Sequence, residues 1–236
     1  MSDESIGDRL RRIERRIAEA CARAGRRPEE VRLLGASKGQ PVAALRAAWE
    51  AGLRLFGENR VQEAAAKVPE LPAAAEWHLI GPLQTNKVRR ALDLFAAVHS
   101  VDRPKIAAAL AREAAARGID LPVFLEVNVA GEASKHGFPA AGLVAAAPPL
   151  ADLPHLRVVG LMAVPPLGGD PEASRPWFRR LRALRDELAA RPEWHGWPGW
   201  LSMGMSDDFE VAVEEGATHV RVGTALFGPR RPSPSP

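Results

Sequence analysis

WLSMGMS at residues 200–206 and HVRVGT at residues 219–224 are two apolar runs that each end in small, hydrogen-bonding residues. A glycine lets the backbone approach a ligand closely, and free N–H groups at the start of a helix favour an anion. If the two runs are neighbouring strands, their ends form a phosphate cradle with Arg221 beside it. On these residues alone, two ordinary strand-to-loop turns remain the alternative.

Six further apolar runs precede these two, and each is followed by a helical pattern, as over residues 140–147 after the fifth run. The expected strands are residues 31–37, 53–57, 77–81, 96–101, 123–129, 156–162, 200–203 and 219–222. Continuous apolar strands separated by helices indicate a parallel sheet covered on both faces. Eight of them in this length predict an α/β fold with a single closed (β/α)8 TIM-type barrel. An open doubly wound sheet is the alternative, although no G-x-G-x-x-G follows the first strand.

An extra helix is expected before the first strand. Ile6, Leu10, Ile13, Ile17 and Cys21 recur at helical spacing and form one apolar stripe, which places Cys21 in the core rather than at a reactive site. We therefore expect residues 1–229 to form one barrel domain that includes this helix. The proline- and serine-rich residues 230–236 are expected to be a disordered tail.

Composition narrows the class of protein. The chain has 236 residues, 46% of them hydrophobic, and a net charge of +3 from 32 basic and 29 acidic residues. So balanced a charge does not indicate nucleic-acid binding. Residues 1–17 carry no signal segment and no run approaches membrane-spanning length. With a single cysteine, a reducing compartment is favoured, so we expect a cytoplasmic protein, without membrane or nucleic-acid partners, that is a monomer.

Polar residues gather at the expected strand ends, which is where barrels carry their chemistry. They are Lys38, Glu58-Asn59, His78 to Gly81, Asn86-Lys87, His99 to Asp102, Asn128, Lys135-His136, Met162, Ser202 to Ser206 and Arg221 to Thr224. No metal-binding motif is found among them.

Lys38 directly follows the first strand, and a partly desolvated lysine there can attack a carbonyl as a neutral amine. Opposite a phosphate cradle, the aldehyde that fits is pyridoxal 5′-phosphate (PLP). A solvated loop lysine remains the alternative, because Lys87 and Lys135 also fall in loops on this face.

A family resemblance rests on motifs that run in order from residue 31 to residue 228. They are residues 37–38, 56–59, 77–87, 99–102, 127–128, 134–135, 160–162, 201–206 and 221–228. Together they resemble the pyridoxal phosphate homeostasis proteins, whose fold is similar to the barrel domain of alanine racemase. Leu79 and Thr85 stand where related proteins often carry phenylalanine and serine.

This resemblance implies a set of PLP-binding residues. Lys38 would form a Schiff base with PLP, and Arg221 would face the pyridine nitrogen. Ser206, Gly223 and Thr224 would hold the phosphate, helped by the backbone of Met205. Asn59 and His78 would line the same site. Members of the family act in vitamin B6 and amino-acid homeostasis, without an established catalytic activity.

Three functions remain open on the sequence. The expected one is a PLP-binding homeostasis protein that holds PLP and hands it to PLP-accepting apo-enzymes without turnover. The alternatives are a racemase-like PLP enzyme and a barrel enzyme that acts on a phosphorylated metabolite without PLP. Racemases of this fold use a tyrosine from the neighbouring subunit, and this chain contains no tyrosine. His78, His99 and His136 remain candidate acids.

Overall fold

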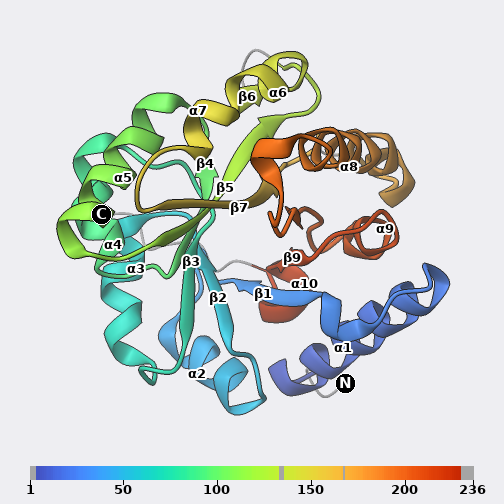
Figure 1. Ribbon diagram of the computed structural model, residues 1–236. Helices are drawn as coiled ribbons and strands as arrows, with labels where there is room; N and C mark the ends of the chain where they lie inside the picture. Colours follow the sequence, from blue (N-terminus) through green and yellow to red (C-terminus); the bar gives the residue numbers. More distant parts are fainter. Residues whose placement is uncertain (1–3, 133–135, 167, 230–236) are drawn as a thin grey trace.

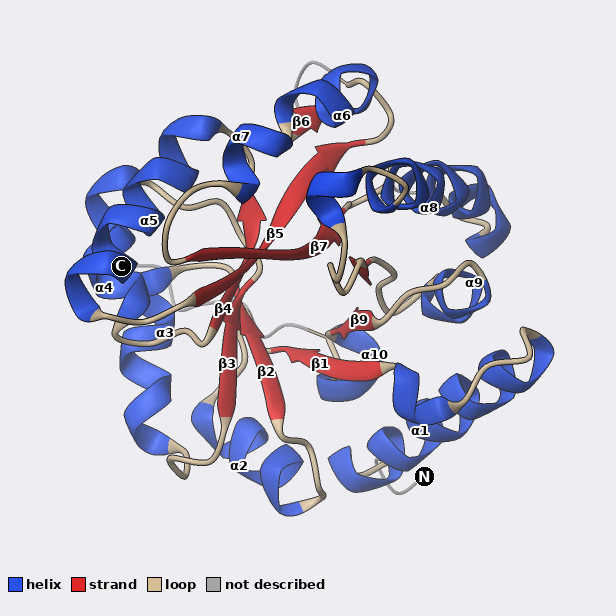
Figure 2. Cartoon of the chain, viewed as in Figure 1, coloured by secondary structure: helices blue, strands red, loops and turns tan. Residues whose placement is uncertain are grey.

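The computed structural model describes residues 4–132, 136–166 and 168–229. Its centre is a closed barrel of eight parallel strands, drawn inside a ring of helices in Figures 1 and 2. The strands are β1 (Arg32–Ala36), β2 (Leu55–Glu58), β3 (Glu76–Leu79), β4 (Ala97–Val101), β5 (Leu121–Asn128), β7 (Leu156–Met162), β8 (Trp200–Ser202) and β9 (His219–Val222). The pairings of β1 with β9 and of β4 with β5 close the ring. They confirm the predicted barrel and exclude the open sheet.

Helices lie on the outside of the barrel, as predicted. They are α1 (Ile6–Arg23), α2 (Val42–Glu50), α3 (Val61–Lys67), α4 (Val88–Leu92), α5 (Pro104–Arg117), α6 (Leu143–Ala146), α7 (Pro148–Ala151), α8 (Arg175–Ala189), α9 (Phe209–Glu214) and α10 (Thr224–Phe227). The helix expected over 140–147 is a 3-10 turn followed by α6, and α7 begins at Pro148, which has no N–H to continue the preceding helix. The pattern did not predict α7, α10 or the short strand β6 (Phe138–Pro139), which pairs with β5.

Helix α1 is the predicted N-terminal addition to the barrel. The Ser5 hydroxyl caps its first turn by accepting the N–H of Asp8. Ile13 and Cys21 of its apolar stripe are fully buried, Ile6 is partly buried, and the helix contacts α9, α10 and α2. Cys21 is therefore a core residue, as predicted.

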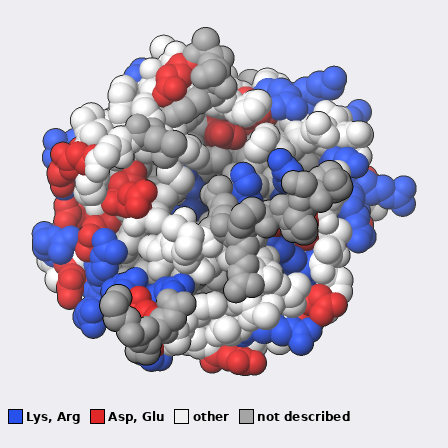
Figure 3. All heavy atoms as spheres, turned by 180° about the vertical axis from the view of Figure 1, so that it is seen from behind, with Lys and Arg blue, Asp and Glu red and all other residues white. Residues whose placement is uncertain are grey.

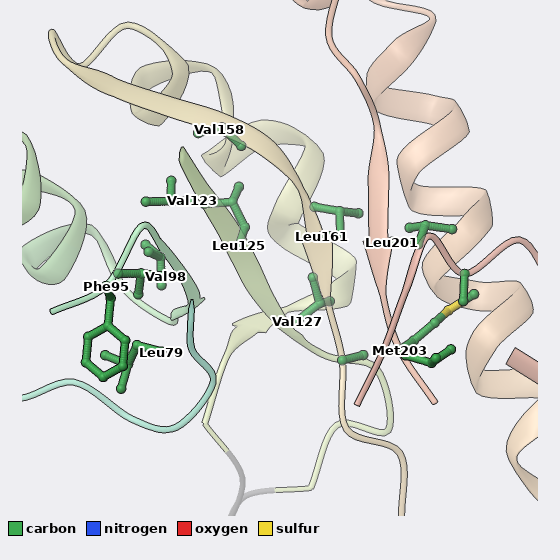
Figure 4. Close-up of a cluster of buried hydrophobic side chains, with 14 of the residues drawn as sticks. Leu79, Phe95, Val98, Val123, Leu125, Val127, Val158, Leu161, Leu201 and Met203 are labelled. Atoms are coloured by element: carbon green, nitrogen blue, oxygen red, sulfur yellow. The ribbon is translucent and has the colours of Figure 1, made fainter. Parts of the chain in front are cut away.

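Most of the hydrophobic core lies between the outer faces of the strands and the helices. Figure 4 shows Leu79, Val98, Leu125, Leu161 and Leu201, which come from five consecutive strands of the barrel wall. Neighbouring residues in a strand point to opposite faces, so the residues between these apolar ones point into the barrel. They include His78, His99 and Ser202, and a hydrogen bond joins β4 to β8, which are not neighbours in the sheet. The barrel interior is therefore unusually polar.

Two parts of the sequence analysis fall on residues without a described structure. They are the expected tail, residues 230–236, and the motif at Ser134-Lys135. Among the helices of the described residues, none is long and apolar enough to cross a membrane.

Candidate functional site

A cavity of about 330 Å³ opens at the carboxyl ends of the strands. Seven of the eight predicted site residues line it: Lys38, Asn59, Met205, Ser206, Arg221, Gly223 and Thr224. These residues follow β1, β2, β8 and β9, or belong to them. The closure of the barrel therefore brings the lysine, the arginine and the two small-residue turns to one place.

Lys38 lies in a turn whose preceding residue, Ser37, is fixed by hydrogen bonds to β2 and α3. Ser37 precedes it and is fully buried, with its N–H donating to the Gly57 carbonyl at 2.9 Å and its hydroxyl donating to Glu58 Oε1 at 2.7 Å. Lys67 of α3 donates to the Ser37 carbonyl at 2.8 Å. These bonds fix the peptide before Lys38 and leave the lysine side chain at the cavity.

Lys67 also forms a buried ion-pair cluster. Its Nζ atom lies 2.6 Å from Glu58 Oε1 and 2.6 Å from Glu63 Oε1. Glu63 Oε1 in turn accepts the N–H of Gly39 at 2.6 Å, on the other side of Lys38. Burial raises the pKa of Glu58, and the hydrogen bonds from Lys67 and Ser37 oppose this rise. The cluster thus fixes the backbone on both sides of Lys38.

The predicted phosphate end is built around Ser206. Its hydroxyl oxygen accepts the N–H groups of Gly223 at 3.2 Å and Ala225 at 3.1 Å, at the start of α10. Within the described residues, no hydrogen-bond acceptor is found for the N–H of Thr224. The N–H of Met205, by contrast, donates to Asp208 Oδ1 at 2.7 Å. A phosphate contact through the Met205 backbone would therefore have to displace that carboxylate.

Gly204 shapes the turn that carries these groups. Its φ is +90°, and a Cβ atom placed there would lie 2.5 Å from the Cβ of Ala212 in α9. The Gly204 carbonyl accepts the Arg221 N–H at 2.9 Å, which links the ends of β8 and β9. Only glycine satisfies both the backbone angle and the close approach of α9.

Arg221 enters the cavity from inside the barrel. It is 4% exposed, and its guanidinium donates to Ser202 Oγ at 2.7 Å and to the Ala163 carbonyl at 2.9 Å. Burial lowers the pKa of Arg221 to about 10, so the side chain stays cationic at neutral pH. Burial, reinforced by Asp102, raises the pKa of Glu126 to about 7, and the charge of Arg221 opposes that rise.

His78 occupies a different place from the other predicted site residues. It is 3% exposed, lies inside the barrel on β3 and is not among the residues that line the cavity. Its ring nitrogens contact His99 and Glu76. Strand β3 ends at Leu79, and Ile80, two residues after His78, reaches the cavity instead.

A second cavity of about 520 Å³ adjoins the first and shares Lys38 and Asn59 with it. Its further lining includes the basic residues Arg60, Lys87, Arg103 and His136. Arg103 is paired with Asp102, and His136 Nδ1 lies 3.6 Å from the same carboxylate. The molecular face opposite to the view of Figure 1 carries both signs of charge around its rim. Within the described ranges, no group of three or more metal-ligating side chains is found.

Sequence reasoning missed three contributors to this region: Lys67, Glu126 and Ser202 acting as a partner of Arg221. Lys67 could have been noticed as one of only five lysines, four residues after Glu63 on an expected helix, a spacing that favours an ion pair. Glu126 and Ser202 lie within expected strands next to apolar residues, so the alternation of faces could have marked them as inward-facing, but not which side chains they meet.

The fold defines a class of protein, the barrel domains that resemble the N-terminal domain of alanine racemase. The family model described as "Alanine racemase, N-terminal domain" matches residues 9–231. Alanine racemase from Bartonella henselae shares the fold, with a TM-score of 0.69 at 13% identity over 95% of this chain and 58% of that chain.

More similar relatives identify the particular family. The pyridoxal phosphate homeostasis protein of Aquifex aeolicus is 46% identical over 225 residues, which cover 95% of this chain and 98% of the relative. That of Pseudomonas aeruginosa is 48% identical, over 96% of each chain. PipY of Synechococcus elongatus, solved with PLP bound, has a TM-score of 0.77 at 41% identity and covers 90% of this chain and 100% of that chain. The chain belongs to the pyridoxal phosphate homeostasis protein family.

Proposed function

We propose that this protein binds PLP covalently through Lys38 and acts in cytoplasmic PLP and amino-acid homeostasis without catalytic turnover, with residues 1–229 as one binding unit. The observation that carries the proposal is that Lys38, Arg221 and the Ser206–Thr224 turns line one cavity. The PLP-bound structure of PipY, which is 41% identical, supports it.

The residues present fit PLP by their chemistry. PLP supplies an aldehyde that condenses reversibly with a primary amine. Lys38 provides that amine. Lys67 donates a hydrogen bond to the carbonyl of the preceding residue, which fixes the backbone from which the Lys38 side chain extends. The hydroxyl of Ser206, the N–H of Gly223 and the N–H of Thr224 would hold a phosphate, because hydrogen-bond donors grouped at one turn suit an anion.

Arg221 would orient the ring from the barrel interior. Its guanidinium is cationic at neutral pH, and a cation beside the pyridine nitrogen disfavours a proton there. Without that proton the ring is a weaker electron sink, which suppresses carbanion chemistry. Racemases of this fold tolerate the same arginine, so this residue alone does not exclude turnover.

Racemisation needs a side chain that donates a proton to the substrate, and this chain offers few suitable ones. The chain has no tyrosine. His78 and His99 are buried and hydrogen-bonded inside the barrel, and burial lowers the pKa of both, so they are poor proton donors at neutral pH. His136 is the remaining candidate, at the second cavity beside Lys38. This arrangement favours a binding protein over a racemase-like enzyme.

The second cavity provides a route for the transfer of PLP from Lys38 to a recipient. The second cavity gives access to Lys38 from a side rich in basic residues. We propose that water, or an amine of a PLP-accepting apo-enzyme, would enter there and replace the Lys38 nitrogen on the aldehyde carbon of PLP, with Lys38 regained as the free amine. Lys38→Ala should therefore not transfer PLP, and transfer as efficient as that of the wild type would rule this route out.

Absorption spectra before and after borohydride reduction, with mass mapping of the modified peptide, test the assignment. We expect a visible band that disappears on reduction and a stable adduct on Lys38. Lys105→Ala, a change at an exposed lysine on α5, is the matched control and should keep the adduct, whereas Lys38→Ala should lose it. A colourless protein that neither binds nor traps added PLP would favour a phosphorylated metabolite as ligand. Incubation with D- and L-amino acids then tests for turnover.

A further inference from the structure

A chain of hydrogen bonds crosses the barrel interior from Arg221 to the opposite end of the barrel. Arg221 Nη1 lies 2.7 Å from Ser202 Oγ, and Ser202 Oγ lies 2.8 Å from His99 Nδ1. His99 Nε2 lies 2.9 Å from His78 Nδ1, and His78 Nε2 lies 2.8 Å from Glu76 Oε1. The chain thus joins the residue at the cavity to the first residue of β3.

The two ends of the chain determine its direction. A guanidinium can only donate, so Ser202 Oγ accepts from Arg221. At the far end the pKa of Glu76 is about 2, lowered chiefly by the hydrogen bond from His78 and also by Arg32, so the ionised carboxylate can only accept. His78 therefore carries its proton on Nε2 and accepts on Nδ1 when it is neutral.

The donor and acceptor roles of His78 determine those of His99. His99 must then donate from Nε2 to His78, and it accepts on Nδ1 from the Ser202 hydroxyl. Burial keeps both rings neutral by lowering their pKa values. Every hydrogen bond from Arg221 to Glu76 therefore runs in one direction, and each of the three groups between them, Ser202, His99 and His78, accepts one bond and donates one.

The inner groups of the chain are isolated from solvent, whereas Arg221 lines the cavity at one end and Glu76 is partly exposed at the other. His99 and Ser202 are fully buried. Glu76 is 37% exposed in its side chain and forms an ion pair with Arg32. The charges of Glu126 and Asp208 act on Arg221, and the ring centroid of His219 lies 5.7 Å from that of His99. Burial lowers the pKa of His219 to about 3, so it too is neutral.

We propose that Ser202, His99 and His78 act as positioning residues for the PLP ring, by holding the Arg221 guanidinium through a one-way hydrogen-bonded chain anchored at Glu76. This role deepens, and rests on, the proposed PLP binding. Because the Ser202 hydrogen is committed to His99, Arg221 meets only acceptor atoms on its inner side, Ser202 Oγ and the Ala163 carbonyl. Its remaining N–H groups are left for the cavity that it lines.

The direction of the chain is testable in the PLP-free protein, independently of any activity. In a ¹⁵N-histidine NMR spectrum at neutral pH, His78 and His99 should each show a protonated Nε2 and an unprotonated Nδ1. Single replacements of the six histidines assign the signals. A protonated Nδ1 on either ring would overturn the one-way chain.

The positioning role is testable with three variants. Ser202→Ala should weaken PLP binding on the order of tenfold, as expected for loss of a hydrogen bond to a charged group, and should move the ¹⁵N shift of the bound ring nitrogen. Ser202→Thr, which keeps the hydroxyl, should restore both. Ser100→Ala is the matched control, since it removes a buried hydroxyl bonded to the Gly81 carbonyl, outside the chain.

The outcomes separate this role from the proposed function. If the wild type binds PLP and Ser202→Ala matches it in affinity and in ring-nitrogen shift, the positioning role is wrong and the proposed function stands. If the wild type binds no PLP, the proposed function fails and this role fails with it. If Ser202→Ala does not fold, the NMR measurement on the wild type still decides the direction of the chain.

Discussion

The Nζ atom of Lys67 lies 2.8 Å from the carbonyl oxygen of Ser37, the residue that precedes Lys38. The same ammonium group neutralises Glu58, whose side chain is fully buried. A lysine on helix α3 thus holds the backbone from which a second lysine extends into the cavity.

Lys67→Met should destabilise the protein strongly. It leaves the Glu58 carboxylate buried without its cation, which costs about 3 to 5 kcal/mol of unfolding free energy when one partner of a buried pair is removed. Urea denaturation measures the loss. The double variant Lys67→Met with Glu58→Gln should recover part of it, because the uncompensated charge is gone. A loss in the single variant as small as that of Lys105→Met would contradict a buried ion pair.

Glu126 should make the PLP-free protein less stable as the pH rises from about 4.5 to 7. Its pKa is raised to about 7 by burial, so the folded state holds a proton over this range that the unfolded state has lost. The contribution of Glu126 to the unfolding free energy therefore falls with rising pH over this window, against the opposite contribution of the buried histidines. Glu126→Gln removes this contribution, so its melting temperature should rise more, or fall less, than that of the wild type between pH 4.5 and pH 7, as measured from pH 4.5 to 8. An unchanged slope would refute the assignment.

The barrel histidines should make the protein sensitive to acid. Burial lowers the pKa values of His78, His99 and His219 below the usual value of 6.5, to about 3 for His219. Below pH 6.5 the unfolded state takes up protons that the folded state does not, so stability is lost as the pH falls.

His219→Phe tests this contribution at one position. Within the described residues, the Nε2 atom of His219 is buried without a hydrogen-bond partner, and its ring packs against Phe124. The variant should lose less stability between pH 7 and pH 4 than the wild type. The exposed His195→Gln is the control and should keep the wild-type slope; equal slopes for all three proteins would be evidence against the effect.

Gly204→Ala should destabilise the turn between β8 and α9. The φ of +90° costs a non-glycine residue about 1 to 2 kcal/mol, and the 2.5 Å approach to Ala212 adds a packing cost, for a total of about 2 to 4 kcal/mol. Denaturation of Gly204→Ala, Ala212→Gly and the double variant separates the terms. The contact part should be recovered in the double variant; strict additivity would show that the contact costs nothing.

The sequence predicted the fold well because its signals are local. Apolar runs such as residues 219–222 alternate with helical patterns, and parallel strands buried on both faces need no distant information to be recognised. Helix boundaries were less exact where prolines intervene, as at Pro148. The short α10 and β6 lack the length that makes a periodic pattern readable.

The candidate site was predicted in part for the same reason. Lys38, Ser206 and Thr224 follow strands whose ends are visible in the sequence, and the barrel places all such ends on one face. His78 was assigned to the site by the family resemblance. It is the second-last residue of β3, but its side chain points into the barrel and bonds to His99 and Glu76 instead of lining the cavity.

The sequence by itself determined the order of strands and helices, the family resemblance and the residues that gather at the carboxyl ends of the strands, because each depends on neighbours along the chain. Only the tertiary structure decided which polar side chains meet. Lys67 reaches Ser37 across 30 positions, and His99 reaches Ser202 across 103. Such contacts depend on barrel closure and on the inward or outward direction of each side chain, which a linear pattern does not record.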